Sequence, residues 1–238
     1  MKMKQFGKLH DGADAHLYSI ENDRIRLDVT DYGAGVVALV VKDAGIDVVQ
    51  GFDSVDGYVS QVPYMGASIG RVCNRIAKGT FRLNGTVYHT PVNNGPNTLH
   101  GGLSGFNAKL WTFTERPDGL QFDYRSADGE EGFPGSLDVK VTYELLEDGI
   151  AFTYSGSSDQ DTLFAMTNHM FFNLHGPRCL SALHHKVAIP ASRYGHVDKD
   201  GLATGEFRDV QGTPFDFRSG MELGLHISED QEDLKLGS

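Results

Sequence analysis

The stretch LDVKVTYEL, residues 137–145, decides the fold class of this chain. Apolar residues occupy every second position in it, so a β-strand here would bury one face and expose the other. Asp148-Gly149 follows, and a second apolar segment begins at Ile150. Because both residues of an Asp-Gly pair tolerate positive φ, the sequence predicts a β-hairpin around this pair.

The same period-two pattern recurs elsewhere in the chain. Apolar and charged residues alternate across 25–29, and the pair Asn84-Gly85 marks another hairpin turn. Helical periodicity is weak, and only residues 53–60 are expected to hold one short helix. Many short strands with glycine-rich turns predict an all-β chain folded as an antiparallel sandwich or barrel. Since no shift in composition marks a boundary, residues 1–238 are expected to form a single domain.

The composition limits the kinds of partner that fit this chain. It has 238 residues, of which 39% are hydrophobic and 22% charged, as in soluble globular proteins. A formal net charge of −11 argues against binding to nucleic acid or to anionic membranes, because both attract basic surfaces. No apolar run reaches the length of a membrane span, and no secretory signal is visible. Two cysteines, Cys73 and Cys179, form no disulfide framework, and reduced thiols predict a cytoplasmic location.

One polar stretch stands out from this β-rich background. Asn, Arg and His recur among glycines in Gly70–Ala77 and again in residues 93–102. The fork of Arg75 and the amide of Asn74 suit adjacent hydroxyl groups, and the glycines after His100 let a ligand approach closely. These residues predict a site for a neutral polyol. The alternatives are an ordinary turn histidine and a surface salt bridge.

A second segment supplies another histidine. If residues 167–174 form one strand, then His169, Phe171 and Asn173 share a face. Polar groups beside an aromatic ring suit a sugar, so Asn173 is predicted to bind substrate together with Asn74 and Arg75. The alternative is a histidine buried in the core and satisfied by a neighbour.

The sequence predicts neither a metal site nor a cofactor. His184 and His185 have no second ligand pair at metal-binding spacing, and no Cys/His cluster occurs. No phosphate-binding loop and no dinucleotide fingerprint occurs either. The turn-rich stretch Asp128–Gly135 is interpreted as a structural loop, and Cys73 as an inert small residue.

Taken together and in this order, the motifs resemble the aldose 1-epimerase (galactose mutarotase) family. The resemblance runs from near the N-terminus to about Phe217. It is carried by Tyr32-Gly33-Ala34, Gly70 to Ala77, Asn94 to Gly102, Gly105-Phe106, Trp111, Asp128 to Gly135, Thr167 to Leu174, and Gly212 to Arg218. It implies a large antiparallel β-sandwich of the galactose mutarotase-like supersandwich type, with no metal and no cofactor.

The resemblance also implies an activity and residue roles. The family interconverts the α and β anomers of aldohexoses such as galactose and glucose by acid–base ring opening. His169 matches the general acid that protonates the ring oxygen, and His100 matches the second histidine, which hydrogen-bonds the sugar. Asn74 and Arg75 match the pair that holds substrate hydroxyls.

Two family motifs do not occur in these 238 residues. One is a Gly-Tyr-Asp-His-Asn-type motif whose Asp binds substrate, and the other carries the Glu that acts as general base. The expectation is therefore a C-terminally truncated member that lacks its last strands, has little activity of its own and self-associates through an exposed sheet edge. The alternatives are a non-catalytic sugar-binding module or inactive fragment, and a compact variant that borrows a carboxylate from a second chain.

Overall fold

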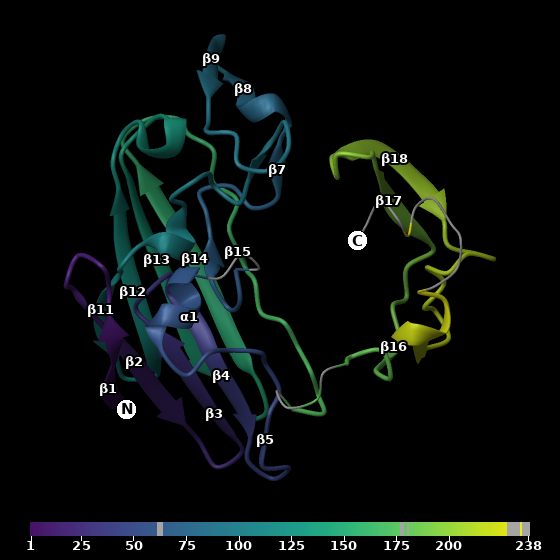
Figure 1. Cartoon of the computed structure of the whole chain (residues 1–238), viewed down its shortest axis with the longest axis horizontal. Helices are drawn as coiled ribbons and strands as arrows, with labels where there is room; N and C mark the ends of the chain where they lie inside the picture. Colours follow the sequence, from purple (N-terminus) through teal and green to yellow (C-terminus); the bar gives the residue numbers. More distant parts are fainter. Residues whose placement is uncertain (61–63, 177–178, 180, 228–233, 235–238) are drawn as a thin grey trace.

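Two antiparallel sheets form the body of the molecule (Figure 1). The structure is a computed structural model that describes residues 1–60, 64–176, 179, 181–227 and 234. The first sheet has the order β1-β2-β3-β4-β5, with bounds Lys2–Lys8, Asp14–Glu21, Ile25–Thr30, Gly35–Val41 and Ile46–Asp47. The second sheet has the order β11-β12-β13-β14, with bounds Thr112–Arg116, Gly119–Ser126, Leu137–Leu145 and Ile150–Ser158. The predicted all-β antiparallel fold is confirmed.

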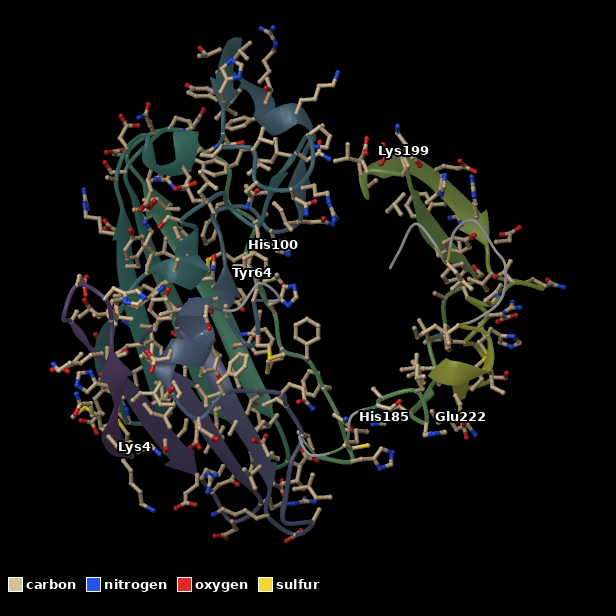
Figure 2. The ribbon with its side chains drawn as sticks, in the orientation of Figure 1. Lys4, Tyr64, His100, His185, Lys199 and Glu222 are labelled. Atoms are coloured by element: carbon tan, nitrogen blue, oxygen red, sulfur yellow. The ribbon has the colours of Figure 1, made fainter. Side chains whose placement is uncertain are left out.

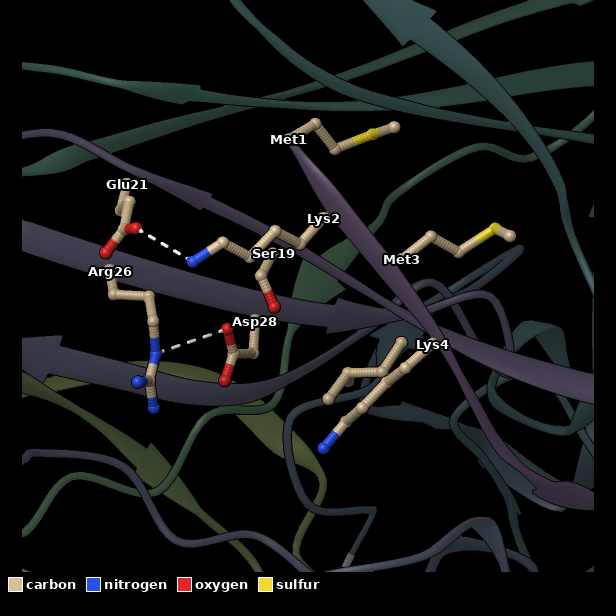
Figure 3. A pocket seen from close by; sticks show the side chains of 9 residues that line it. Met1, Lys2, Met3, Lys4, Ser19, Glu21, Arg26 and Asp28 are labelled. Atoms are coloured by element: carbon tan, nitrogen blue, oxygen red, sulfur yellow. Dashed lines mark hydrogen bonds and ion pairs between the residues drawn. The ribbon is translucent and has the colours of Figure 1, made fainter.

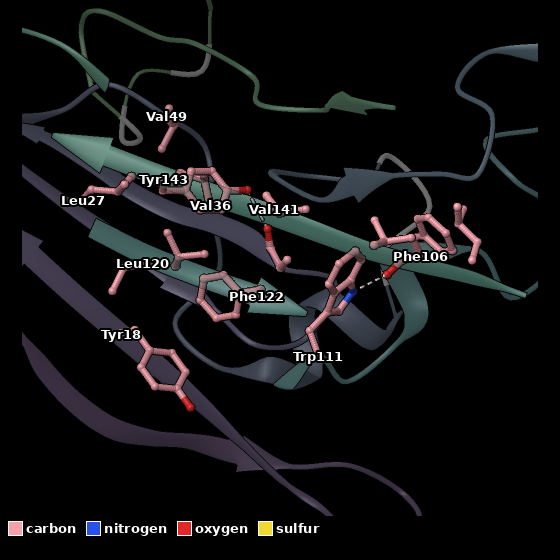
Figure 4. Packing of buried hydrophobic residues seen from close by; sticks show 14 residues of the cluster. Tyr18, Leu27, Val36, Val49, Phe106, Trp111, Leu120, Phe122, Val141 and Tyr143 are labelled. Atoms are coloured by element: carbon pink, nitrogen blue, oxygen red, sulfur yellow. Dashed lines mark hydrogen bonds between the residues drawn. The ribbon is translucent and has the colours of Figure 1, made fainter. Parts of the chain in front are cut away.

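The main core lies between these two sheets (Figure 4). Leu27 and Val36 of the first sheet and Phe122 and Val141 of the second are all fully buried in it. The hydroxyl of the buried Tyr143 donates to the Ala34 carbonyl oxygen at 2.7 Å, which ties β13 to the start of β4. Burial of this apolar area contributes most of the stability of such a sandwich.

The local signals gave the correct elements. Residues 137–145 form β13, in which the apolar positions from Leu137 to Tyr143 are buried while Asp138 and Lys140 between them are exposed. The predicted hairpin joins β13 to β14 in full antiparallel register. Asn84 and Gly85 form a two-residue turn with φ of 50° and 82°. The predicted short helix is α1, Val55–Ser60. Its buried residues pack against the first sheet and form a second, smaller hydrophobic cluster with it.

Three short two-stranded ladders outside the two large sheets position the site. They are β6 (Ser68–Ile69) with β15 (Thr167–Asn168), β7 (Arg75–Ile76) with β10 (Thr98–Leu99), and β8 (Thr80–Leu83) with β9 (Thr86–His89). Single 3-10 turns lie at Ala77–Gly79, Phe106–Ala108, Glu130–Gly132 and Leu223–Leu225.

The last described elements are two further ladders, drawn in yellow-green beside the sandwich in Figure 1. They are β16 (Lys186–Val187) with β19 (Met221–Glu222), and β17 (Arg193–Val197) with β18 (Ala203–Asp209). Within the described residues, no helix has both the length and the apolar character needed to cross a membrane.

The predicted strand over residues 167–174 is wrong. β15 ends at Asn168, and beyond it only an isolated bridge between Val49 and Phe172 remains. The side-chain oxygen of Asn168 accepts the N–H of Met170 at 3.0 Å. Such a local side-chain bond takes the Met170 N–H out of the ladder, so the regular alternation of faces ends there.

Candidate active site

Backbone pairing brings the two polar motifs together. β7 and β10 pair antiparallel with Arg75 opposite Leu99, so the preceding Asn74 faces the following His100. The His100 N–H donates to the Asn74 carbonyl oxygen at 3.0 Å, and the Asn74 N–H donates to Nδ1 of His100 at 3.0 Å. These two hydrogen bonds fix the imidazole of His100 beside the Asn74-Arg75 pair.

Two neighbours hold the His100 loop in this position. Gly101 has φ +90°, and a Cβ there would collide with the Gly70 carbonyl oxygen, so both conformation and space require glycine. The Asn93 amide bonds both backbone groups of Leu99, accepting its N–H at 2.6 Å and donating to its carbonyl oxygen at 3.0 Å. Asn93 therefore replaces a missing strand partner next to His100.

His169 reaches the same place from the other side of the chain. Its N–H donates to the Ala67 carbonyl oxygen at 2.9 Å, and its carbonyl accepts the Gly66 N–H at 3.0 Å. The imidazole ring centroids of His100 and His169 lie 5.1 Å apart at an interplanar angle of 85°. The structure thus brings together both predicted catalytic histidines, although the predicted strand that was to present His169 is absent.

Arg75 lies within the same cluster. Its Nε donates to Asn94 Oδ1 at 3.0 Å, and its Nη1 donates to Asn74 Oδ1 at 3.3 Å and to the Gly201 carbonyl oxygen at 3.4 Å. Gly201 belongs to the turn between β17 and β18, which therefore touches the site. Among the described residues Nη2 has no protein partner, so its two N–H groups remain for a ligand.

The electrostatics of His100 differ from those of a free imidazole. Burial, then the nearby His169 and Arg75, lower the pKa of His100 to about 4. The ring is therefore neutral near pH 7. Because Nδ1 accepts the Asn74 N–H, the single proton lies on Nε2. His100 can thus donate one hydrogen bond from Nε2.

Asn173 lies outside this cluster. It is 4% exposed, its side-chain nitrogen donates to the Cys179 carbonyl oxygen at 2.8 Å, and its side-chain oxygen accepts the His175 N–H at 3.0 Å. The amide is used within its own loop, because β15 ends before His169 and the expected shared face does not form. The substrate-binding role of Asn173 stays a prediction that this geometry does not favour.

Sequence reasoning missed two residues that shape the site. Tyr64 lies with its ring centroid 4.9 Å from that of His100, and no motif in the sequence points to it. Arg71, only 2% exposed, donates from Nη1 to the Pro134 carbonyl oxygen at 2.8 Å and from Nε to the Ser126 hydroxyl at 3.0 Å. Arg71 therefore anchors the segment that leads to Asn74, and a buried guanidinium cannot be told from a binding one by sequence.

The stretch 128–135 has the structural role that the sequence indicated. Asp128 accepts the Gly135 N–H at 2.6 Å, and Glu130 pairs with Lys109 at 2.7 Å. Glu131 accepts the Leu103 N–H at 2.7 Å. These carboxylates hold loops together.

A separate surface hollow on the first sheet is a poor rival for the site (Figure 3). Its charged side chains pair with each other, Lys2 with Glu21 and Arg26 with Asp28, each at 3.4 Å. The described residues also contain no group of three or more potential metal-ligating side chains. Both cysteines are free, and the cytoplasmic location inferred from them stays a prediction.

Comparison with known proteins agrees with the motifs and the fold. The model of the aldose 1-epimerase family matches residues 16–235. The chain belongs to the aldose 1-epimerase family. Bovine galactose mutarotase is 44% identical over 228 residues, covering 94% of this chain and 67% of that protein. The aldose 1-epimerase of Escherichia coli is 33% identical, covering 95% and 67% respectively. Both names denote sugar isomerases.

Solved structures show the same architecture. An aldose epimerase homologue from C. elegans has a TM-score of 0.82 and 31% identity, covering 87% of this chain and 65% of that one. A galactose 1-epimerase from Lactobacillus acidophilus has a TM-score of 0.87 at 24% identity, covering 99% and 70%, and supports the fold alone. The predicted family and the mutarotase-like β-sandwich are confirmed. The chain spans about two thirds of the length of these aldose 1-epimerase relatives.

Proposed function

We propose that this chain carries the acid and the substrate-binding groups of an aldose 1-epimerase that interconverts the α and β anomers of an aldohexose such as galactose or glucose. One observation carries the proposal. Two imidazoles, 5.1 Å apart, lie beside an arginine that has an open Nη2. Several hydrogen-bond donors that converge in this way suit a neutral, hydroxyl-rich ligand.

The reaction needs one proton removed and one delivered. A base takes the proton of the anomeric hydroxyl, the C1–ring oxygen bond breaks as the C1 carbonyl forms, and an acid protonates the released ring oxygen. Rotation about C1–C2 and the reverse steps then give the other anomer. We assign the acid to His169, because among the described residues neither of its ring nitrogens has a hydrogen-bond partner.

The two histidines have different roles in this proposal. Two imidazoles this close do not both carry a positive charge readily, and the proximity of His169 is one reason why the pKa of His100 is low. His100 then stays neutral and donates from Nε2 to a sugar oxygen near the reacting centre. Asn74 and Arg75 hold further hydroxyls and fix the orientation of the ring.

The proposal assigns the base to no residue of these 238. Among the described residues, no carboxylate forms a hydrogen bond or an ion pair with the imidazole of His100 or His169. The same observation favours the second candidate function, a module that binds the sugar without turning it over. The two candidates differ in whether anomer exchange appears when a base is supplied.

The deciding experiment is chemical rescue of anomer exchange. Exchange between the anomeric protons of galactose is followed by NMR saturation transfer, with and without added acetate as external base. We expect the chain to bind galactose, with little exchange until acetate is added. His169→Ala should remove about 10²–10⁴-fold of the rescued rate, the usual contribution of one positioned acid.

His184→Ala is the matched control, because the His184 side chain is 79% exposed and pairs only loosely, at 3.7 Å, with Glu222. It should leave the rescued rate unchanged. Binding without any rescued exchange would favour the sugar-binding module. Equal rescue in wild type and His169→Ala would show that His169 is not the acid, and absence of binding would refute both functions.

A further inference from the structure

Tyr64 is in contact with both histidines of the site. Its ring centroid lies 4.9 Å from that of His100 at an interplanar angle of 78°, and 5.9 Å from that of His169 at 41°. Figure 2 shows Tyr64 immediately beside His100. With the two imidazoles 5.1 Å apart, the three rings form one closed triangle. The edge-to-face packing on His100 is one that aromatic rings favour.

The turn that carries Tyr64 is bound to the backbone of His169. The Ala67 N–H donates to the Tyr64 carbonyl oxygen at 3.1 Å and closes the turn. Two further hydrogen bonds join this turn to the backbone of His169. The Gly66 N–H donates to the His169 carbonyl oxygen at 3.0 Å, and the His169 N–H donates to the Ala67 carbonyl oxygen at 2.9 Å. Tyr64 and His169 are therefore held as one unit against the His100 loop.

The backbone of Tyr64 has a conformation that aromatic residues rarely adopt. Its φ is 59°, in the left-handed region, and the neighbouring Asn74 and His100 have φ of 61° and 55°. Residues held in this region need a surrounding structure that compensates for the strain, and they concentrate at functional sites. Glycine or asparagine would fit this backbone with less strain, so the presence of tyrosine points to a use for its side chain.

The aromatic ring of Tyr64, rather than its hydroxyl, makes the contacts in the site. Among the described residues the Tyr64 hydroxyl has no hydrogen-bond partner, while the half-buried ring covers both imidazoles. We propose that Tyr64 is a positioning residue whose ring wedges the imidazoles of His100 and His169 into their mutual orientation and excludes water between them. The inference rests on the proposed function for its catalytic meaning, but the geometric claim stands without it.

Two substitutions separate the ring from the backbone and from the hydroxyl. Tyr64→Asn removes the ring and suits the left-handed backbone, so the chain is expected to fold. Tyr64→Phe keeps the ring and removes only the hydroxyl. Tyr88→Ala is the control, since Tyr88 is also half-buried but stacks on Phe81, at 5.3 Å, away from the histidines.

The first readout is the NMR titration of the His100 ring. The groups that bear on it are Tyr64, the charges of His169 and Arg75, and the Asn74 N–H on Nδ1. Tyr64→Asn should raise the titration midpoint of His100 by roughly one unit, because water then reaches the ring. Tyr64→Phe and Tyr88→Ala should leave it in place.

The second readout is the acetate-rescued exchange of galactose. Tyr64→Asn should lower the maximal rate at least about tenfold while changing the half-saturating sugar concentration less, because misorientation affects the reacting geometry most. Tyr64→Phe should retain most of the rate. An unchanged His100 midpoint in Tyr64→Asn, or a Tyr64→Phe variant as impaired as Tyr64→Asn, would overturn the proposal. The titration needs no sugar, so its result does not depend on whether the proposed function holds.

Discussion

His100 illustrates how one backbone contact defines the chemistry of a side chain. The Asn74 N–H occupies Nδ1, so the neutral ring can only donate from Nε2. Burial, followed by the nearby His169 and Arg75, keeps the ring neutral by lowering its pKa to about 4. A histidine in this state binds a sugar oxygen well and is a poor proton acceptor. Its role therefore differs from that of His169, although the two residues have the same side chain.

This state of His100 predicts how stability depends on pH. As pH falls from about 6.5 toward 4, the unfolded chain takes up a proton at His100 and the folded chain does not. The contribution of His100 to the free energy of unfolding should therefore decrease over that window and level off below it. Urea denaturation measured along this pH range should show the slope in wild type.

His100→Asn provides the comparison for that prediction. Asparagine suits the left-handed backbone at this position, where φ is 55°, and its oxygen can accept the Asn74 N–H. The variant should lose the contribution of His100 to the pH dependence of the free energy of unfolding. The carboxylates and the other histidines should contribute as before. Identical slopes in the two proteins would contradict the neutral, buried state assigned to His100.

At the scale of elements, the site depends on one tight loop after β10. Gly101 lets this loop pack directly on the Gly70 peptide, and Asn93 holds its other flank. The loop in turn sets the pairing between Asn74 and His100. Loss of this packing should therefore affect the position of a site residue as well as stability.

Gly101→Ala tests this dependence against a matched glycine. Gly101 and Gly12 have nearly the same φ, +90° and +89°, but nothing lies within 4 Å of a Cβ at Gly12. Gly12→Ala should lower the free energy of unfolding by about 1–2 kcal/mol through backbone strain alone. Gly101→Ala should cost about 1–3 kcal/mol more, because it also collides with the Gly70 carbonyl.

Urea denaturation gives both values, and the NMR signal of the Asn74 N–H reports the bond to His100. That signal should shift in Gly101→Ala and stay in Gly12→Ala. Equal destabilisation in the two variants would mean that close packing at Gly101 contributes nothing.

At the scale of the whole molecule, large apolar side chains are exposed on β14 and in the segment after β15. Phe152 on β14 is 40% exposed, and Phe172 and Leu174 beyond β15 are 50% and 60% exposed. Among the described strands, β14 pairs only with β13 and so ends its sheet. An open strand edge beside apolar side chains favours association between chains.

We therefore expect the 238-residue chain to self-associate in a concentration-dependent manner, as measured by sedimentation velocity. Phe152→Lys should shift the population toward monomer, because a lysine on an edge strand opposes pairing. Val87→Lys on β9, where Val87 is 42% exposed, is the control and should have no such effect. A monodisperse wild-type monomer at high concentration would contradict the prediction.

The sequence by itself determined the local elements, because their causes lie within a few residues. The alternation in 137–145 fixes which face of β13 is buried, and Asn84-Gly85 fixes a turn through its own backbone preferences. It also indicated the aldose 1-epimerase family and named the histidines that the structure brings together. Local reasoning failed at residues 167–174, where the side chain of Asn168 competes with the ladder for the Met170 N–H.

Only the tertiary structure decided how the site is assembled. His100 and His169 are far apart in the sequence and meet because each directly follows a strand of a different ladder, β10 paired with β7 and β15 paired with β6. The contact of Tyr64 with both, and the engagement of Asn173 within its own loop, follow from the same packing. Such contacts depend on strand register and on the shape of the space between elements, and no local pattern in the sequence encodes either of these.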